Sequence, residues 1–124
     1  MRRLLTTALL ISAYIPAAQA MTVAEFLAKS DAVKAKGMLA MMSSDLTLLR
    51  NEMKSVSTAY RADIDAAQKA GKPPHSCPPP KGKASISSDD VMAELQSLPT
   101  AEKARTSVKT AFYAMMKKRY PCGK

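Results

Sequence analysis

Hydrophobic residues recur every three or four positions through the middle of the chain, at Leu46, Leu49, Met53, Val56, Tyr60, Ile64 and Ala67. This spacing places all of them on one stripe of a long helix, with Leu49 and Met53 expected among the buried residues. Ser43 and Ser44 are candidate caps at its start. Gly71 and the prolines that follow it are stop signals. The pattern therefore predicts one long central helix.

A shorter apolar pattern precedes the central helix. Thr22 and Glu25 have the spacing of a capping box, in which the threonine hydroxyl accepts from an amide near Glu25 and the glutamate reaches back. The helix that starts here has an apolar side formed by Val23, Phe26, Leu27 and Val33. Gly37 is expected to end or bend it, because glycine commonly follows the last turn of a helix.

A stretch rich in proline, glycine, lysine and serine, from Gly71 to Ser87, follows the central helix. Proline fixes φ and lacks an amide donor, so we expect an extended loop here. Ser88 is then expected to cap a short helix that runs to about Leu98. Pro99 ends that helix.

A final helix is predicted from Thr100, its cap, towards Tyr120, with a buried stripe formed by Ala104, Val108, Ala111, Phe112 and Met115. The chain after the proline-rich loop is too short to form a core of its own. Residues 21–124 are therefore expected to form a single helical domain. The predicted fold class is all-α, a small bundle of about four helices, one of which is the long central helix.

Residues 1–20 have the layout of a secretory signal peptide. Arg2 and Arg3 give a positive start, residues 4–15 carry no charge, and Ala-Gln-Ala at residues 18–20 forms a small-x-small cleavage site. The apolar run is shorter than the roughly 20 residues that span a bilayer. We expect cleavage before Met21, a periplasmic location and no stable insertion into a membrane.

Cys77 and Cys122 are the only cysteines in the sequence. In an oxidising compartment a single pair is typical of a disulfide, which here joins the proline-rich loop to the end of the last helix. Closing this span stabilises the fold by on the order of 4 kcal/mol in the chain-entropy model. Redox or metal chemistry is the alternative, but a Cys-x-x-Cys motif is absent.

Candidate metal and catalytic residues are few, and no catalytic, cofactor-binding or metal-binding residue is predicted. His75 is the only histidine and lies two residues before Cys77, but zinc takes about four ligands, so an exposed loop histidine is expected. Met38, Met41 and Met42 form a cluster whose thioethers suit Cu(I). Methionine also fills gaps in cores short of aromatics, and packing is the favoured interpretation. The chain is not expected to be an enzyme.

Positive charge is concentrated in the second half of the chain. Residues 21–65 contain six basic and six acidic residues, whereas residues 66–124 contain eleven basic and four acidic ones. Export argues against nucleic acid, which leaves anionic lipid, acidic cell-wall polymer or an acidic protein as the partner. The residues expected to contact it are Lys72, His75, Lys81, Lys83, Lys117, Lys118 and Arg119. A solvated basic face that only aids solubility is the alternative.

Short motifs in the second half are similar to those of a known family. Residues 75–79 read His-Ser-Cys-Pro-Pro, a capped helix and Pro99 follow, and residues 120–122 read Tyr-Pro-Cys. Residues 74–122 resemble the Rap/Tai-type immunity proteins of bacteria. The resemblance implies a small exported helical protein that protects a cell by binding peptidoglycan amidases injected through type VI secretion.

The leading hypothesis is therefore a periplasmic protein that blocks a toxin enzyme by occupying its cleft. Two other functions are compatible with the sequence. One is a small acid-stress chaperone, which exposes apolar surface when acid weakens it. The other is a basic protein bound to the cell wall or to a membrane surface. A homodimer is also compatible with the sequence.

Overall fold

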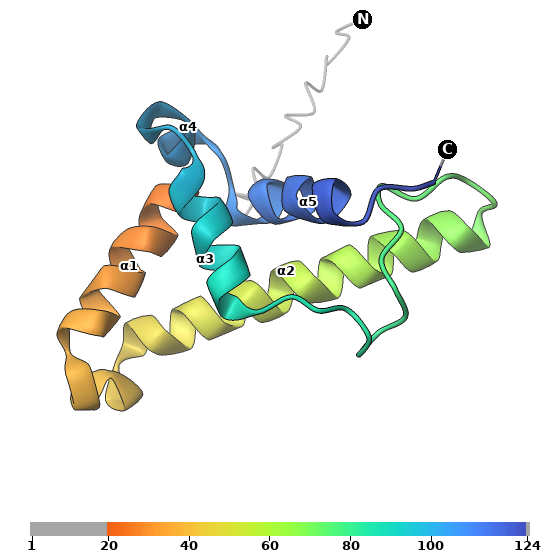
Figure 1. Cartoon of the computed structure of the whole chain (residues 1–124). Coiled ribbons are helices and arrows are strands. Elements are labelled where there is room, and N and C mark those ends of the chain that lie inside the picture. Colours follow the sequence, from red (N-terminus) through yellow and green to blue (C-terminus); the bar gives the residue numbers. More distant parts are fainter. Residues whose placement is uncertain (1–19, 124) are drawn as a thin grey trace, which may run out of the picture.

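The computed structural model of the chain describes residues 20–123 (Figure 1). The predicted signal peptide lies outside the described residues, apart from Ala20. The described part contains five α-helices and one 3-10 helix: α1 (Val23–Ala35), η1 (Gly37–Met42), α2 (Ser44–Lys69), α3 (Ser88–Ser97), α4 (Thr100–Arg105) and α5 (Val108–Arg119). Its only β pairing is one isolated bridge. The predicted all-α fold is confirmed, with more and shorter helices than expected.

The long helix α2 is the central element that the sequence predicted. It spans 26 residues and buries Leu49, Val56, Tyr60 and Ile64 on one side. Met53, expected on the same buried stripe, is only partly buried against the core. Figure 1 shows α2 running the length of the molecule, with α1 at its start and α5 alongside its second half.

The hydrophobic core joins four helices. Val23 and Phe26 of α1, with the residues of α2, pack in one cluster with residues of α3 and α5: Val91, Leu95, Val108, Ala111, Phe112, Met115 and Met116. The Phe112 ring meets the Tyr60 ring edge to face, with centroids 5.6 Å apart. The core thus extends along α2 from Leu49 to Ile64.

The start and end of α1 follow the sequence prediction. The Thr22 hydroxyl accepts from the backbone amide of Glu25 at 3.1 Å, and a Glu25 carboxylate oxygen accepts from the amide of Thr22 at 3.4 Å. After the helix, Gly37 has a φ of 55°, a left-handed conformation that glycine adopts at little cost. The capping box and the glycine stop are both confirmed.

The predicted final helix is interrupted, which corrects the expectation of one helix from Thr100 to Tyr120. Thr106 and Ser107 are extended, and Ser107 forms the bridge with Thr22. The Val23 amide donates to the Thr106 carbonyl at 2.9 Å, and the Val108 amide donates to the Met21 carbonyl at 2.9 Å. Backbone groups that a continuous helix would use internally therefore bind the chain before α1.

Three smaller corrections concern residues 87–104. Ala104, predicted on the buried stripe, is exposed because it lies on the short helix α4 before the interruption. Pro99 rather than Thr100 occupies the N-cap position of α4, and Thr100 is the first residue of the helix. Ser87 rather than Ser88 caps α3, and its hydroxyl accepts from the Asp90 amide at 3.1 Å.

The methionine cluster is not packed in the core, contrary to the favoured interpretation. Met38, Met41 and Met42 lie on η1 with exposed fractions of 96%, 72% and 87%. The reason is position, because η1 forms the turn between α1 and α2 at one end of the molecule (Figure 1). Met115 and Met116, in contrast, are buried in the core.

The predicted disulfide is present. Cys77 in the proline-rich loop is bonded to Cys122, with the two Cα atoms 4.8 Å apart. It fastens the loop after α2 to the chain just beyond α5. Between residues 20 and 123, no helix combines the length and apolar character needed to cross a bilayer.

Candidate functional site

The proline-rich loop is fixed to the helices at several points, beginning beside the disulfide. Ser76 is fully buried, and its hydroxyl is hydrogen-bonded to the hydroxyl of Tyr60 on α2. The next residue, Cys77, donates its backbone amide to the Tyr120 carbonyl at 2.8 Å. Buried polar groups in a native structure are normally paired, and these contacts satisfy that requirement while setting the path of the loop.

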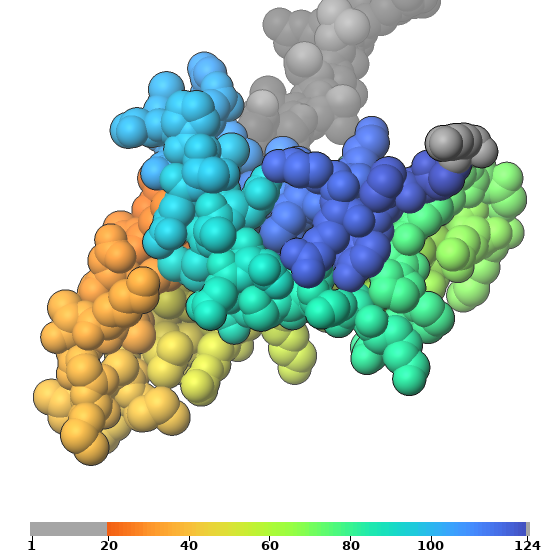
Figure 2. Space-filling view, viewed as in Figure 1, coloured from red at the N-terminus to blue at the C-terminus, as the bar shows by residue number. Residues whose placement is uncertain are grey.

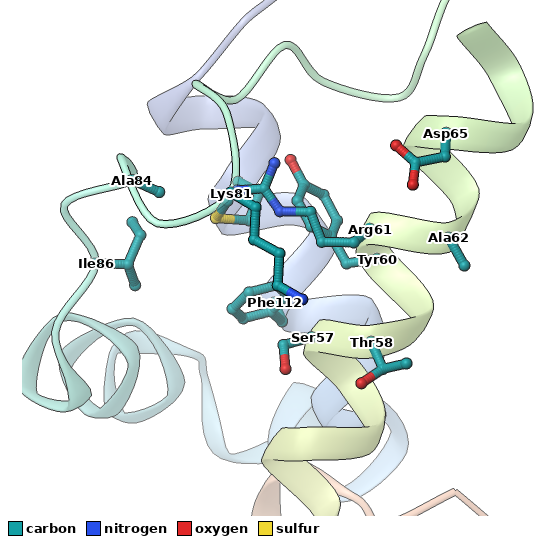
Figure 3. Close-up of a pocket in the computed structure, with 11 residues that line it drawn as sticks. Ser57, Thr58, Tyr60, Arg61, Ala62, Asp65, Lys81, Ala84, Ile86 and Phe112 are labelled. Carbon is teal, nitrogen blue, oxygen red and sulfur yellow. The ribbon is translucent and has the colours of Figure 1, made fainter. Parts of the chain in front are cut away.

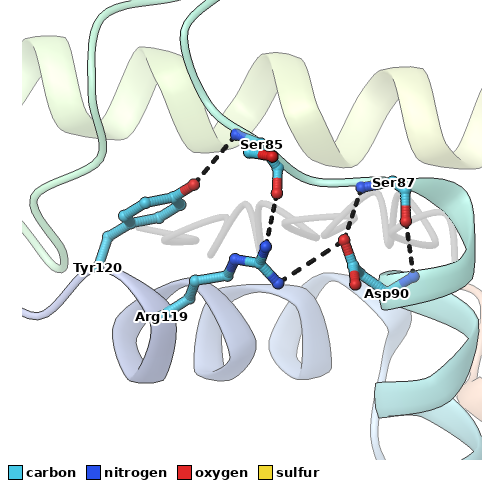
Figure 4. A network of polar contacts seen from close by, with 5 residues as sticks. All are labelled: Ser85, Ser87, Asp90, Arg119 and Tyr120. Carbon is cyan, nitrogen blue, oxygen red and sulfur yellow. Dashed lines mark hydrogen bonds and ion pairs between the residues drawn. The ribbon is translucent and has the colours of Figure 1, made fainter.

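Three further hydrogen bonds hold the second part of the loop. The Arg61 guanidinium donates to the Pro79 carbonyl at 3.0 Å. At Ser85 the backbone is bound on both sides, because its carbonyl accepts from Arg119 at 2.6 Å and its amide donates to the Tyr120 hydroxyl at 3.2 Å (Figure 4). The loop therefore lies against both α2 and the end of α5.

Asp90 completes this network. Its carboxylate accepts from the Ser87 amide at 2.8 Å and lies 3.6 Å from the Arg119 guanidinium (Figure 4). The hydrogen bond from the Ser87 backbone, followed by the Ser87 hydroxyl and the Arg119 charge, lowers the pKa of Asp90 below its ordinary value. The ionised carboxylate thus orients Arg119 towards the Ser85 carbonyl.

A groove of about 520 Å³ lies between the loop, α2 and α5 (Figure 3). Its lining combines apolar and charged side chains: Ser57, Thr58, Tyr60, Arg61, Ala62, Asp65, Lys81, Ala84, Ile86, Phe112 and Met116. Tyr60, Phe112 and Met116 are core residues and form its apolar part. In Figure 3 the Lys81 side chain extends from the loop towards Phe112, near Arg61. We call this hollow the basic groove.

The basic groove continues along α2. A second hollow of about 390 Å³ shares Arg61, Asp65 and Lys81 with it and is lined by the three consecutive prolines, 78–80. The Arg61 guanidinium carbon lies 6.0 Å from the centre of the Tyr60 ring. Two cations and one carboxylate therefore line a partly apolar channel, which suits an acidic, partly apolar peptide segment.

The structure divides the predicted contact residues into groups. Lys81 lines the basic groove, and the Lys83 amide donates to the Pro80 carbonyl at 2.9 Å in the same turn of the loop. Lys117 lies one helical turn after Tyr113, whose ring faces His75. Lys117 is therefore on the side of α5 that carries Tyr113, and not on the side that lines the basic groove. Lys72, Lys81, Lys83 and Lys117 are exposed, and none takes part in the ion pairs found within residues 20–123.

Lys118 and Arg119 have internal partners instead. The Lys118 ammonium is 3.2 Å from a Glu94 carboxylate oxygen on α3, and Arg119 belongs to the Asp90 network. The two residues therefore connect α5 to α3 and to the loop. Reversing their charge would remove these internal contacts together with any contact to a partner, which makes them poor reporters of partner binding.

His75 is exposed and packs against an aromatic side chain of α5. Its ring centroid lies 5.4 Å from that of Tyr113, and the Tyr113 hydroxyl donates to Asp63 at 2.6 Å. Burial, together with the hydrogen bond to Asp63, raises the pKa of Tyr113. His75 thus contributes to the contact between the loop and α5, away from the basic groove.

Sequence reasoning missed most of the residues that shape the groove. Arg61 is the clearest case, because it follows the stripe residue Tyr60 directly and reads as a solvated charge on a helix surface. Only the folded position of the loop shows that Arg61 donates a hydrogen bond to the Pro79 carbonyl. The one signal in the sequence was the adjacent pair Tyr60 and Arg61, followed later in the chain by the prolines at 78–80.

The arrangement supplies charge and apolar surface for binding. Across residues 20–123, His, Cys, Asp and Glu side chains form no group of three that could hold a metal ion. Comparison with protein-family models, curated proteins and solved structures found no match to this chain. The geometry of the groove and the motifs in the sequence are therefore the basis for the function proposed below.

Proposed function

We propose that the protein is a periplasmic binding protein of the immunity type, which inhibits a peptidoglycan amidase toxin by holding an acidic segment of it in the basic groove. The observation that carries the proposal is the loop itself. Residues 75–80 contain the motif that resembles immunity proteins, and Lys81, directly after them, lines the groove. The disulfide closes the same loop onto the end of α5.

The anchored loop favours binding because little order has to be gained when a partner arrives. Its backbone is already held by Tyr60 through Ser76, by Arg61 and by Arg119. A loop fixed in its bound conformation loses less conformational entropy on association. The cations of the groove attract an acidic partner and accelerate the encounter, and the apolar part is covered when the partner binds.

The test uses a type VI amidase toxin encoded in the same genome. We expect the protein to inhibit hydrolysis of purified peptidoglycan by this enzyme and to bind it in surface plasmon resonance. The double variant Lys81→Glu/Lys83→Glu should lower the association rate by roughly tenfold or more and weaken its dependence on salt. Circular dichroism should show an unchanged fold, since both side chains are exposed.

The matched control is Lys109→Glu/Lys117→Glu, which changes the charge by the same amount on the side of α5 that carries Tyr113. The Lys109 ammonium lies 5.5 Å from the centre of that ring. Retained inhibition by this variant supports the basic groove. Weakened binding by the control alone would move the contact to the other side of α5, and absence of any inhibition or binding by the wild type would refute the immunity function.

A further inference from the structure

The turn between α1 and α2 is an apolar surface that the proposed function does not use. We call Gly37–Met42 the apolar tip. Met38, Leu39, Met41 and Met42 have exposed fractions between 70% and 96%, and none of the six residues is buried. Contiguous exposed apolar side chains on a protein that otherwise has a closed core usually mark a contact surface.

The apolar tip is a protrusion and not a pocket. Figure 2 shows it at the extreme end of the molecule, where the orange and yellow parts of the chain meet. Figure 1 shows that the disulfide-bearing chain end lies at the opposite end of α2. A convex apolar surface cannot enclose a ligand, so a contact through it would place its side chains in another phase or in another molecule.

The base of the tip is held firmly, so the apolar side chains are presented at a fixed place. The Lys29 ammonium lies 3.3 Å from an Asp45 carboxylate oxygen and joins α1 to α2. The Lys36 ammonium donates to the Ser43 hydroxyl at 3.1 Å across the turn. The 3-10 helix between these contacts is too short to fold its side chains back onto the core.

Charge at the base of the tip selects the partner. Residues 29–54 contain five basic and three acidic residues, and the ion pair of Lys29 with Asp45 leaves four basic residues against two acidic ones. Lys34, Lys36 and Arg50 are exposed around the tip. Residues 21–124 contain 17 basic and 10 acidic residues, a formal charge of +7, so a second copy would be repelled, whereas an anionic surface would be attracted.

We propose that the apolar tip inserts into the interface of a bilayer that contains anionic phospholipid. Methionine and leucine side chains enter the boundary between headgroups and acyl chains, while the lysine stems let their ammonium groups stay with the lipid phosphates. Each nearby basic residue adds to the attraction of an anionic leaflet. The contact is peripheral and reversible, and it leaves the basic groove at the other part of α2 accessible.

The first test is sedimentation with vesicles of phosphatidylethanolamine and phosphatidylglycerol. The quadruple variant Met38→Ser/Leu39→Ser/Met41→Ser/Met42→Ser should lose roughly tenfold or more of the vesicle affinity of the wild type, since four apolar side chains no longer leave water. The groove variant Lys81→Glu/Lys83→Glu should bind the vesicles to within about threefold of the wild type. Vesicles of phosphatidylcholine alone should bind weakly.

The second test reports insertion directly. The sequence contains no tryptophan, so Met41→Trp provides a single fluorophore at the tip, and Gln96→Trp provides a control near the end of α3. Addition of the anionic vesicles should shift the emission of the first variant to shorter wavelength and leave the second unchanged. Vesicle binding by the quadruple variant equal to that of the wild type would overturn the proposal. So would a wild-type dimer that the quadruple variant abolishes, without vesicle binding.

Discussion

Asp90 is a residue at which three parts of the molecule meet. Its carboxylate accepts from the Ser87 amide at the start of α3, and it lies 3.6 Å from Arg119 at the end of α5. Arg119 in turn donates to the Ser85 carbonyl in the loop. One half-buried side chain therefore contacts the start of α3, joins α3 to α5 and helps to set the position of the loop beside the groove.

The pKa of Asp90 predicts how acid affects this region. Because the folded-state pKa is lowered, the stabilisation is fully present above the ordinary value of 3.8 and is lost as the pH falls through the lower folded-state value. Asp90→Asn should therefore lower the thermal midpoint at neutral pH, and the difference from the wild type should shrink as the pH falls below 3.8. Circular dichroism melts across this range measure the difference.

The neighbouring variant Asp89→Asn is the control, because Asp89 is exposed and lies in the same first turn of α3. This variant removes an acid near the same helix start but leaves the contacts of Asp90 with Ser87 and Arg119 in place. A deficit of Asp90→Asn that stayed constant down to the lowest pH would contradict the role of the ionised carboxylate.

At the scale of elements, the two faces of α2 differ in solvent exposure, as two adjacent leucines show. Leu49 is 8% exposed and belongs to the core, whereas Leu48 is 45% exposed. Leu49→Ala should lower the free energy of unfolding by about 2–5 kcal/mol, because it removes buried methyl groups and leaves a cavity. Leu48→Ala should change it by about 0.5 kcal/mol or less.

Urea denaturation of both variants measures these changes in the same background. Met53→Ala should fall between them, since Met53 is only partly buried. Equal losses for the two leucine variants would mean that the stripe read from the sequence does not define the buried side of α2.

Local patterns predicted those elements whose ends are set by nearby residues. The start of α1 depends on Thr22 and Glu25, its end on Gly37, and the disulfide on the only two cysteines. The break before α5 could not be read in this way. Thr106 and Ser107 are extended because they pair with residues 21–23, more than eighty positions earlier in the chain.

The candidate site was predictable only in outline. The basic loop and its closure to α5 follow from composition and the cysteine pair. The groove depends on where the loop folds back, and that is decided by single contacts such as the Tyr60–Ser76 hydrogen bond and the Arg61 bond to the Pro79 carbonyl. The residues that make these contacts do not recur at a regular spacing, so no sequence pattern predicts them. The prediction that Met38, Met41 and Met42 pack in the core was wrong, because composition does not distinguish residues of a core from residues of a turn.

At the scale of the whole molecule, the disulfide stabilises the fold by restricting the conformations of the unfolded chain. Replacement by Cys77→Ala/Cys122→Ala should cost on the order of 4 kcal/mol in the chain-entropy model. For a domain of this size the thermal midpoint should fall by roughly 15–30 °C. Hydrogen bonds at Ser76 and Ser85 still hold the loop, so helical circular dichroism should persist at low temperature.

Calorimetry of the wild type with and without reductant provides the parallel measurement on the natural sequence. Both experiments should give the same loss within error. An unchanged midpoint in either would show that the loop contacts alone close the fold and that the bond between Cys77 and Cys122 adds little to them.

The bridge between Thr22 and Ser107 also sets the order in which the chain can close. Residues 21–23 are synthesised early, but the backbone groups that they bind at residues 106–108 are made 85 positions later. Cys77 likewise cannot form its bond before Cys122, 45 positions later, has been made. Contacts of such long sequence separation form late. The packing of α1 on α2 can therefore form as soon as residues 23–69 have been made, whereas the two closing contacts wait for residues 106–122.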